Sequence, residues 1–207
     1  LTGNIASGKS EAESIFRKHD IPTLDADKIV KDLLMPGTQI YQQIKDKYKN
    51  LYPEIILKKS SHLNKKLLRE IIFKDPKQKK FLEDLLHPQV QQVMHKFAKD
   101  FLEDKHHIYE NAPFCVLSIP LLFDKSKYPD INKILYIDAC EKDQIKRLIN
   151  RDNINEDLAK AMLASQPDRK TRLSQCDDVI ENNGDISDLE KKALNMIKIY
   201  SSQKSTK

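Results

Sequence analysis

The sequence predicts an α/β fold in which helices flank a parallel sheet, and three observations support this prediction. The first is a set of apolar, β-branched runs typical of strands that are buried on both faces of a sheet. These runs are residues 114–119, 133–138 and 178–181. The second is their alternation with helical patterns, because parallel strands are connected through right-handed crossovers. These helical patterns are residues 141–151, 155–165 and 187–199. The third is a glycine-rich pattern at the start of the chain that joins a strand to a helix.

That pattern is a complete phosphate-binding loop, Gly3-x-x-x-x-Gly8-Lys9-Ser10. The glycines allow a tight turn whose N–H groups face an oxyanion, and a helix that begins near Gly8 adds its positive dipole end. Lys9 is expected to reach the β- and γ-phosphates, and the Ser10 hydroxyl to ligate Mg²⁺. The sequence therefore predicts a nucleoside triphosphate as ligand, although a plain turn can have the same pattern.

The residues around the loop favour the phosphate-binding interpretation. Residues 11–18 form an amphipathic helical pattern with Ala12, Ile15 and Phe16 on one side, which is the helix that the loop should open into. The strand that should precede the loop is missing, because the sequence starts at Leu1. We therefore expect further apolar residues upstream of Leu1.

Two carboxylates follow the loop region at Asp25 and Asp27. Residues 21–27 are predicted to form a short strand, and residues 28–34 a helix that stops at Met35-Pro36-Gly37. Residues two apart on a strand face the same side, so both carboxylates would point toward the phosphate loop. A kinase needs a carboxylate to accept the proton of the attacked hydroxyl and one near Mg²⁺. The alternative is that one aspartate caps the following helix.

From Thr38 to about Asp104 the sequence is lysine-rich and almost entirely helical in pattern, which predicts a helical insertion. Within it, His87-Pro88 is expected to end one helix and open another, with the proline in a first turn. His87 could contact a ligand or serve as a cap. Residues 105–113 are predicted to form a linker or turn.

Arg147 and Arg151 are four residues apart and share one face of the predicted helix at 141–151. Two guanidinium groups aimed at a transferring phosphoryl group would offset its charge. The alternative is a surface ion pair, for example between Arg151 and Asp143 or Asp152, which contributes little.

The composition narrows the class of protein. The chain has 207 residues and a net charge of +5, which suits an anionic substrate, although a lysine-rich solvated surface gives the same sign. No run approaches the ~18–20 apolar residues of a membrane span, and no signal peptide is visible. Three widely spaced cysteines (Cys115, Cys140 and Cys176) indicate reduced thiols and a cytoplasmic protein. The absence of tryptophan argues against a base-stacking nucleic-acid platform.

Taken together, these segments resemble the dephospho-coenzyme A kinase family. The segments in family order are Leu1–Ser10, Ile21–Asp27, Met35–Thr38, Leu86–Pro88, Ile119–Phe123, Gln144–Asp152, Ser165–Gln166 and Asp177–Gly184. Many kinases share the phosphate loop, whereas the aspartate pair, the Pro-Leu-Leu-Phe segment and the Asp-Val-Ile…Asn-Asn-Gly segment are together much more specific. The resemblance covers nearly the whole chain.

The resemblance implies transfer of the ATP γ-phosphoryl group to the ribose 3′-hydroxyl of dephospho-coenzyme A (dephospho-CoA), with Mg²⁺, in the last step of coenzyme A biosynthesis. It implies a P-loop nucleotide-kinase-like core with a helical substrate-binding insertion and a lid. The expected bounds are 1–34, 106–140 and 173–207 for the core, 35–105 for the insertion and 141–172 for the lid. The implied partners are ATP and dephospho-CoA, with no nucleic acid and no membrane, in a monomer or weak homo-oligomer.

The resemblance also assigns roles by motif position. Asp27 becomes the best candidate base with Asp25 beside it, and Arg147 and Arg151 become lid arginines. The implied catalytic residues are Asp27, Lys9, Arg147 and Arg151. The implied ATP-binding residues are Gly3, Ala6, Ser7, Gly8, Lys9, Ser10, Glu11, Arg147, Asn182 and Asn183, the asparagines near the adenine pocket. The implied substrate-binding residues are Asp25, Asp27, His87 and the basic lid residue Arg172. The implied Mg²⁺ ligands are Ser10 and Asp27.

Four positions depart from the family pattern. Glu11 stands where a threonine usually lies beside the α-phosphate, and a carboxylate there should repel ATP unless it turns to solvent or pairs with a cation such as Arg17 or Lys18. Asn4 replaces a common glycine, Gln91 replaces an arginine, and Ser118 provides no acid at the strand end. Three alternatives remain open: another small-molecule kinase on the same core, a non-catalytic nucleotide-binding module, and a nucleic-acid kinase.

Overall fold

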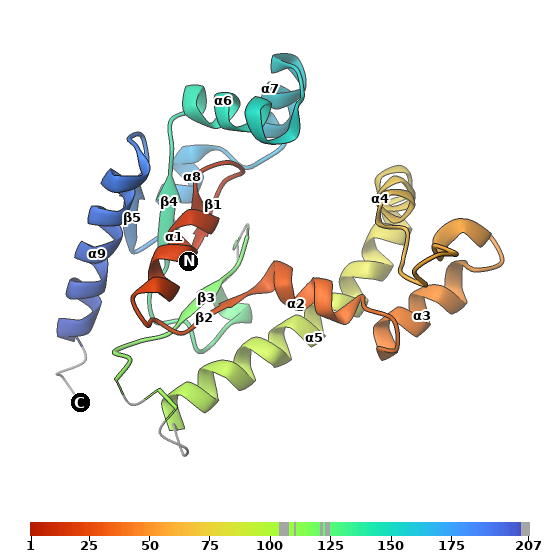
Figure 1. The fold of residues 1–207 in the computed structure, drawn as a ribbon, viewed down its shortest axis with the longest axis horizontal. Helices are drawn as coiled ribbons and strands as arrows, with labels where there is room; N and C mark the ends of the chain where they lie inside the picture. The colour runs from red at the N-terminus through yellow and green to blue at the C-terminus, as the bar shows by residue number, and fades with distance from the viewer. Residues whose placement is uncertain (104–107, 110, 121, 123–124, 204–207) are drawn as a thin grey trace. The chain divides into compact units, whose positions relative to one another are not determined.

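The computed structural model describes residues 1–103, 108–109, 111–120, 122 and 125–203 (Figure 1). Contacts divide the chain into two compact units, which are described separately. Unit 1 comprises Leu1–Asp25 and Phe97–Lys207, and unit 2 comprises Ala26–Lys96. Of the resemblance segment at 119–123, Leu121 and Phe123 lie outside the described residues.

Unit 1 contains the predicted parallel sheet. Its strands are β1 (Thr2–Gly3), β2 (Thr23–Asp25), β3 (Val116–Ser118), β4 (Leu135–Asp138) and β5 (Asp178–Glu181). The strands pair in parallel as β1-β4-β5 and as β2-β3. The backbone of Leu1 joins the two groups, because its nitrogen donates to Leu117 O at 2.8 Å and its carbonyl accepts from Ile119 N at 2.9 Å. The strands therefore lie side by side in the order β2-β3-β1-β4-β5, which confirms the predicted fold class.

The strand before the phosphate loop, predicted to be missing, is present as the two-residue β1. It forms because Thr2 and Gly3 lie beside Tyr136 and Ile137 of β4. A strand of two residues is shorter than expected, and its pairing with β4 stabilises it more than local propensity does.

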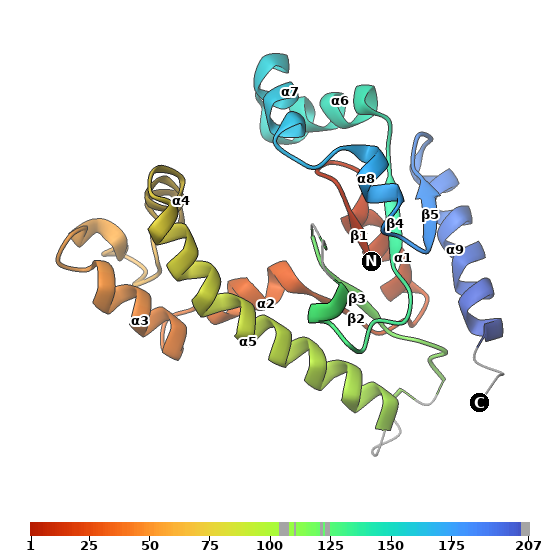
Figure 2. The ribbon, with the colours of Figure 1, turned by 180° about the vertical axis from the view of Figure 1, so that it is seen from behind.

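Helices α1 (Lys9–Lys18), α8 (Arg169–Leu173) and α9 (Ile186–Ser202) flank the sheet of unit 1, and α6 (Glu141–Asp152) and α7 (Glu156–Ala164) lie beyond one end of its strands (Figure 2). Unit 1 also contains the 3-10 turn η2 (Lys125–Lys127) and the last part of α5 (Pro76–Glu103). The core confirms the predicted apolar side of α1: Ala12, Ile15 and Phe16 are buried in one cluster with Ile137 of β4 and Leu189 of α9. Full burial of a side chain such as Phe16 stabilises the fold by about 1.5–3 kcal/mol.

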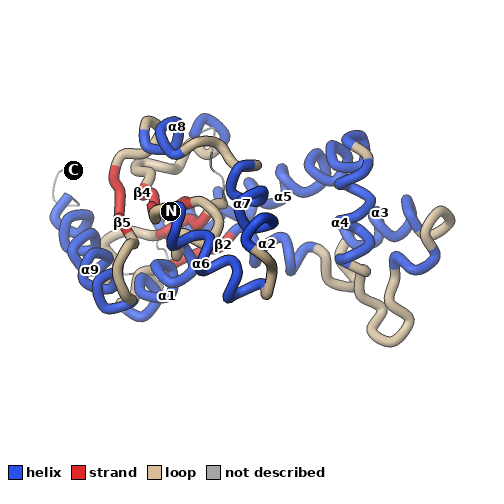
Figure 3. Tube along the Cα trace, turned by 90° about the horizontal axis from the view of Figure 1, so that it is seen from above, coloured by secondary structure: helices blue, strands red, loops and turns tan. Residues whose placement is uncertain are grey.

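Unit 2 contains helices and loops but no strand (Figure 3). Its elements are α2 (Ala26–Leu33), α3 (Gln39–Tyr48), the 3-10 turn η1 (Pro53–Ile55), α4 (Lys65–Lys74) and the first part of α5 (Pro76–Glu103). Thr38 and Asn64 cap α3 and α4 by accepting from the backbone nitrogens of Tyr41 and Leu67. Helix formation is confirmed over most of 38–104, but residues 49–64 are largely irregular apart from η1.

Unit 2 has an apolar core of its own. Ile44, Tyr48 and Ile55 are its most deeply buried members, and Leu68 and Leu82 pack in the same cluster. The Tyr48 hydroxyl donates to Gln78 Oε1 at 2.9 Å, so its polar end is satisfied where the ring is buried. Among the described residues of both units, no helix is long and apolar enough to cross a membrane.

The predicted helix break at His87-Pro88 is wrong, because both residues lie inside the 28-residue helix α5. A proline inside a helix has no N–H to donate to the carbonyl of the residue four before it, here Asp84. His87, Pro88 and Gln89 are all exposed, so that water can reach this side of the helix. Residues of high helix propensity on both sides of Pro88 allow the helix to continue past it.

The predicted end of the strand at 21–27 is also wrong. β2 ends at Asp25, and α2 begins at Ala26, two residues earlier than expected. Asp27 therefore lies in the first turn of α2, where a carboxylate is favoured by the helix dipole. Asp25 and Asp27 do not share a strand face, and Asp27 belongs to unit 2 whereas Asp25 closes a strand of unit 1.

Candidate active site

The phosphate loop runs from the end of β1 to the start of α1, and close packing requires both of its glycines. A Cβ on Gly3 would lie 2.6 Å from Ser7 Oγ and 2.8 Å from the carbonyl oxygen of Ile137. Gly8, the N-cap of α1, has a φ of 95°, and a Cβ there would lie 2.1 Å from Asn182 Nδ2. Ala6 also has a positive φ, 55°. The loop thus turns sharply and brings its backbone against the ends of neighbouring strands.

The first turn of α1 opens directly out of the loop. Lys9 is its first residue, and the exposed side chains of Ser10 and Glu11 follow. The backbone N–H groups of a first helical turn have no partner within the helix and carry its partial positive charge. This arrangement can bind an oxyanion such as a phosphate group.

Side chains from distant elements hold the loop. Gln144 of α6 donates from Nε2 to the Ile5 carbonyl at 2.8 Å, and the Ile5 nitrogen donates to Gln166 Oε1 at 3.0 Å. Both backbone polar groups of Ile5 are therefore satisfied by glutamines at the two ends of the α6–α7 segment. Gln144 is buried, so this contact is shielded from water.

Two further side chains hold the next carbonyls. Arg147 lies 3.3 Å from both the Ala6 and the Ser7 carbonyl oxygens, and Asn182 Nδ2 donates to the Ser7 carbonyl at 2.7 Å. Arg147 also donates to the Asn182 carbonyl at 2.8 Å. In a planar trans peptide the C=O and the following N–H point in opposite directions. The Ala6 and Ser7 carbonyls point toward Arg147, so the N–H groups of Ser7 and Gly8 point away from it. The Ser7 N–H donates to the Asn4 carbonyl and closes the turn.

We expect Gln144→Ala to raise the dissociation constant of ATP about fivefold. A hydrogen bond contributes about 0.5–1.5 kcal/mol, and its loss leaves the Ile5 carbonyl without this donor and the loop less well ordered before ATP binds. Isothermal titration calorimetry would measure this change. Gln42→Ala is the matched control, because the Gln42 side chain donates to the exposed Asp46 of the same helix in unit 2. An unchanged affinity for Gln144→Ala would show that the loop is rigid without this contact.

Arg147 and Arg151, the two arginines predicted to belong to a lid, differ in their surroundings. Arg147 contacts the loop, whereas Arg151 binds Asp152 through Nε and Nη2 at 2.8 and 2.7 Å. This pair raises the pKa of Arg151 and lowers the pKa of Asp152 through their hydrogen bonds. Because the Arg151 side chain is 56% exposed, the ion pair contributes little to stability. The structure thus brings Arg147 to the loop and leaves Arg151 turned toward its sequence neighbour.

The lysine of the loop is bound to two side chains, Glu13 of α1 and Ser118 at the end of β3. Lys9 Nζ donates to Glu13 Oε1 at 2.7 Å and to Ser118 Oγ at 2.9 Å. The Ser118 hydroxyl in turn donates to Glu13 Oε1. Ser118 lies opposite Asp25 in the β2–β3 register, so Asp25 ends its strand beside this cluster.

The remaining predicted residues lie in different surroundings. Asn183 Oδ1 accepts from Cys140 N at 2.7 Å and so fixes the N-terminus of α6. Arg172 of α8 is buried, and burial lowers its pKa. Its guanidinium is therefore shielded from solvent. His87 is exposed on α5, and Asp27 is exposed in α2, both in unit 2. Chain connectivity limits the separation of the Asp25 and Asp27 Cα atoms to about 7 Å.

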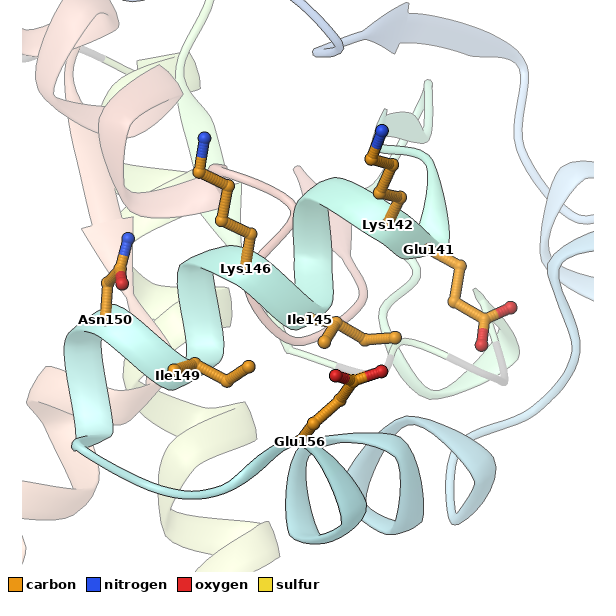
Figure 4. Close-up of a pocket in the computed structure, with 7 residues that line it drawn as sticks. All are labelled: Glu141, Lys142, Ile145, Lys146, Ile149, Asn150 and Glu156. Atoms are coloured by element: carbon orange, nitrogen blue, oxygen red, sulfur yellow. The ribbon is translucent and has the colours of Figure 1, made fainter.

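A groove of about 470 Å³ lies between α6 and the start of α7 (Figure 4). Ile145, Ile149 and Glu156 face the space between the two helices, whereas the amino groups of Lys142 and Lys146 point away from α7 (Figure 4). Helical periodicity places Gln144 and Arg147 on a different face of α6 from Ile145 and Ile149. The groove is therefore separate from the phosphate loop.

The sequence interpretation did not predict that Glu13 binds Lys9, or that Gln144 and Gln166 hold the backbone of Ile5. For Glu13 a signal was available, because it lies four residues after Lys9 and four before Arg17, the spacing of helical ion pairs. The glutamine contacts with Ile5 join residues 139 and 161 positions apart, and no periodicity indicates them. The one available signal was that both glutamines lie in segments that resemble the family.

Comparison with known proteins gives one consistent result. The family model for dephospho-CoA kinase matches residues 1–188. A dephospho-CoA kinase of Hahella chejuensis is 36% identical over 189 residues, covering 91% of this chain and 85% of that protein. A dephospho-CoA kinase of Coxiella burnetii is 37% identical over 192 residues, covering 92% and 90%. The solved structure of dephospho-CoA kinase from Campylobacter jejuni superimposes with a TM-score of 0.67 at 27% identity, covering 98% and 96%.

Proposed function

Because this chain belongs to the dephospho-CoA kinase family, it is an enzyme that phosphorylates dephospho-CoA with ATP in coenzyme A biosynthesis, and we propose which of its residues do so. In this proposal the loop from Gly3 to Ser10 binds the ATP phosphates, with Ala6, Ser7 and Glu11 beside them. The acceptor is the ribose 3′-hydroxyl of dephospho-CoA.

The observation that carries the proposal is the ordered loop. Its carbonyls are held by Gln144, Arg147 and Asn182 on one side, and the first turn of α1 opens on the other. A binding site that is ordered before its ligand arrives loses less conformational entropy on binding. Phosphoryl transfer depends mainly on positioning and on electrostatic stabilisation, and a rigid loop supplies the positioning.

The proposed chemistry uses one carboxylate as a base. Asp27 accepts the proton of the 3′-hydroxyl as that oxygen attacks the γ-phosphorus, and ADP leaves on the opposite side. Asp25, at the end of β2 beside Ser118, orients the acceptor. Lys9 offsets the charge on the phosphate oxygens. Arg147 joins it if it releases the loop and Asn182 carbonyls, and Arg151 joins it if it releases Asp152.

The residues at the start of α1 suit Mg²⁺. Ser10 presents an exposed hydroxyl in the first turn, and magnesium is usually held by one or two protein oxygens together with substrate phosphates. Within the described part of the chain, no group of three or more His, Cys, Asp or Glu side chains forms an all-protein metal site. We propose Ser10 and Asp27 as ligands. When bound, Mg²⁺ neutralises charge on the β- and γ-phosphates.

The proposed division of labour follows the sequence expectation. Residues 35–105 bind dephospho-CoA, with His87 and Arg172 contacting it, and residues 141–172 form a lid over ATP, with Asn182 and Asn183 near the adenine. A separate apolar core within Ala26–Lys96 supports the idea of a helical unit with its own role. The core of the enzyme comprises the remaining ranges 1–34, 106–140 and 173–207.

An ADP-release assay tests the proposal directly. Purified chain is mixed with ATP, Mg²⁺ and dephospho-CoA, and nucleosides and shikimate serve as competing acceptors. We expect turnover with dephospho-CoA alone, and ³¹P NMR of the product should show a ribose 3′-phosphate monoester. Turnover with another acceptor would favour a different small-molecule kinase, and ATP binding without turnover would favour a nucleotide-binding module.

Glu11→Thr should tighten ATP binding at least threefold with little change in kcat. Glu11 is exposed, as expected, while its suggested partners bind other carboxylates: Arg17 binds Glu13 and Lys18 binds Glu190. A threonine removes the charge repulsion and adds a hydroxyl donor for the α-phosphate. Calorimetric titration of ATP measures the change, with Glu190→Thr on α9 as the control for loss of a surface carboxylate. Weaker binding in the threonine variant would contradict the proposed loop geometry.

We also propose that the protein is cytoplasmic and a monomer or weak homo-oligomer, with no nucleic-acid partner. The described cysteines form no disulfide. Burial raises the pKa of Cys115 to about 11, which keeps this thiol protonated at neutral pH. Cysteines that form no disulfide are usual in proteins of a reducing compartment.

A further inference from the structure

The carboxylate of Glu13 lies inside unit 1 and is surrounded by three polar partners. Glu13 is 3% exposed, on the side of α1 that packs against the sheet. Lys9 Nζ lies 2.7 Å from Oε1, and Arg17 Nη2 lies 3.3 Å from Oε2. The Ser118 hydroxyl donates to Oε1. A buried carboxylate is tolerated only when it is paired and hydrogen-bonded, and these three groups meet that need.

This pairing affects the charge that Lys9 presents to a ligand. An ammonium group has three N–H donors, and the contacts to Glu13 and Ser118 use two of them. The Lys9 side chain is only 12% exposed, so the attraction between Lys9 and Glu13 is weakly screened by solvent. In the protein without nucleotide, the negative charge of Glu13 therefore offsets much of the positive charge of Lys9.

We propose that Glu13 is a counter-ion of Lys9 that competes with the phosphates of ATP and so sets the affinity of this enzyme for the nucleotide. The inference rests on the proposed role of Lys9 in binding the β- and γ-phosphates. When Lys9 turns to the phosphates, Arg17 and Ser118 still hold the Glu13 carboxylate. The exchange therefore leaves no buried charge without a partner, and Glu13 acts through Lys9 rather than on the reacting atoms.

The test is Glu13→Gln, which keeps the shape of the side chain and one acceptor oxygen but removes its charge. We expect the dissociation constant of ATP, measured by calorimetry without dephospho-CoA, to fall about tenfold, while kcat changes less than twofold. A tenfold change corresponds to about 1.4 kcal/mol. Glu13→Asp keeps the charge, and its ATP affinity should stay within about threefold of the original. Glu190→Gln is the matched control. Glu190 lies on α9, and its carboxylate pairs with Lys18 at the C-terminal end of α1.

If Glu13 acts through Lys9, the effect of Glu13→Gln on ATP affinity requires Lys9. If the carboxylate simply repels the phosphates, the effect remains without Lys9. In a Lys9→Ala background, Glu13→Gln should change the ATP dissociation constant less than twofold. An equal gain in both backgrounds would overturn the inference, since the carboxylate would then repel the phosphates directly. Unchanged or weaker binding of Glu13→Gln in the presence of Lys9 would also overturn it, since Glu13 would then only position the lysine.

Two further results separate the possible failures. If Lys9→Ala alone binds ATP as tightly as the original chain, the proposed phosphate site is wrong, whatever Glu13 does. If Glu13→Gln does not fold without ATP, Glu13→Met provides the same test with the same expected direction, because it fills a similar volume without charge. Thermal unfolding with and without ATP checks either variant: the rise in Tm on adding ATP should be larger than for the original chain.

Discussion

Lys9→Ala is expected to lower kcat by at least about 10³-fold while changing the melting temperature little. The lysine begins α1 at the phosphate loop, where its charge would stabilise the transferring phosphoryl group. Losses of 10²–10³ are usual for one preorganised electrostatic group, and a P-loop lysine meets two phosphates at once. A steady-state assay with dephospho-CoA and a thermal unfolding curve measure both quantities.

The fold of the Lys9→Ala variant is expected to survive because Glu13 keeps two of its partners, Arg17 and the Ser118 hydroxyl. Lys18→Ala is the matched control, since this exposed lysine on the same helix pairs with Glu190 of α9 at the surface. Near-normal turnover with an unchanged melting temperature would refute the assigned role of Lys9. A large fall in melting temperature would instead show that Lys9 is chiefly a partner for the buried Glu13 carboxylate.

Asp27→Asn should lower kcat by about 10²–10⁴, the usual contribution of a general base. At 1.36 kcal/mol per decade this corresponds to about 3–5 kcal/mol of the activation barrier. The amide is isosteric but accepts no proton, so the affinity for dephospho-CoA should change less than kcat. Pre-steady-state measurement of ADP formation separates the chemical step from product release.

The neighbouring carboxylate is the comparison for this prediction. Asp25→Asn should lower kcat less than Asp27→Asn, because Asp25 lies at the end of β2 beside Ser118 and is assigned to orientation. The reverse order of effects would mean that the two aspartates exchange roles. Equal and small effects would show that neither residue accepts the proton.

The sequence predicts the parts of this molecule that depend on local pattern. The apolar runs predict β3, β4 and β5, and the spacing of Ala12, Ile15 and Phe16 predicts the buried side of α1. The glycine positions of the phosphate loop are likewise confirmed by the short distances that a Cβ would make at Gly3 and Gly8. In each case the determining interaction lies within a few residues or follows from one periodicity.

The predictions that failed depend on interactions that are distant in sequence or that override propensity. β1 exists because β4 lies beside it, not because two residues favour a strand. Pro88 is accommodated because its side of α5 is exposed. α2 begins at Ala26, so Asp27 lies on a helix rather than a strand. A carboxylate in the first turn stabilises the helix through its dipole. The contacts of Gln144 and Gln166 with Ile5 require the folded sheet.

The loop contacts have a consequence for biosynthesis of the protein. Asn182, which holds the Ser7 carbonyl, lies 175 residues further along the chain than Ser7. On a ribosome that adds ~5–20 residues per second, this separation takes roughly 10–35 s to synthesise. The helical residues 26–96 have their own core and local contacts, so they can fold during that interval. The phosphate loop gains this contact only after Asn182 has been synthesised. Until then the nucleotide site lacks one of the groups that hold it, and ATP binding stabilises the nascent chain less against proteolysis or aggregation.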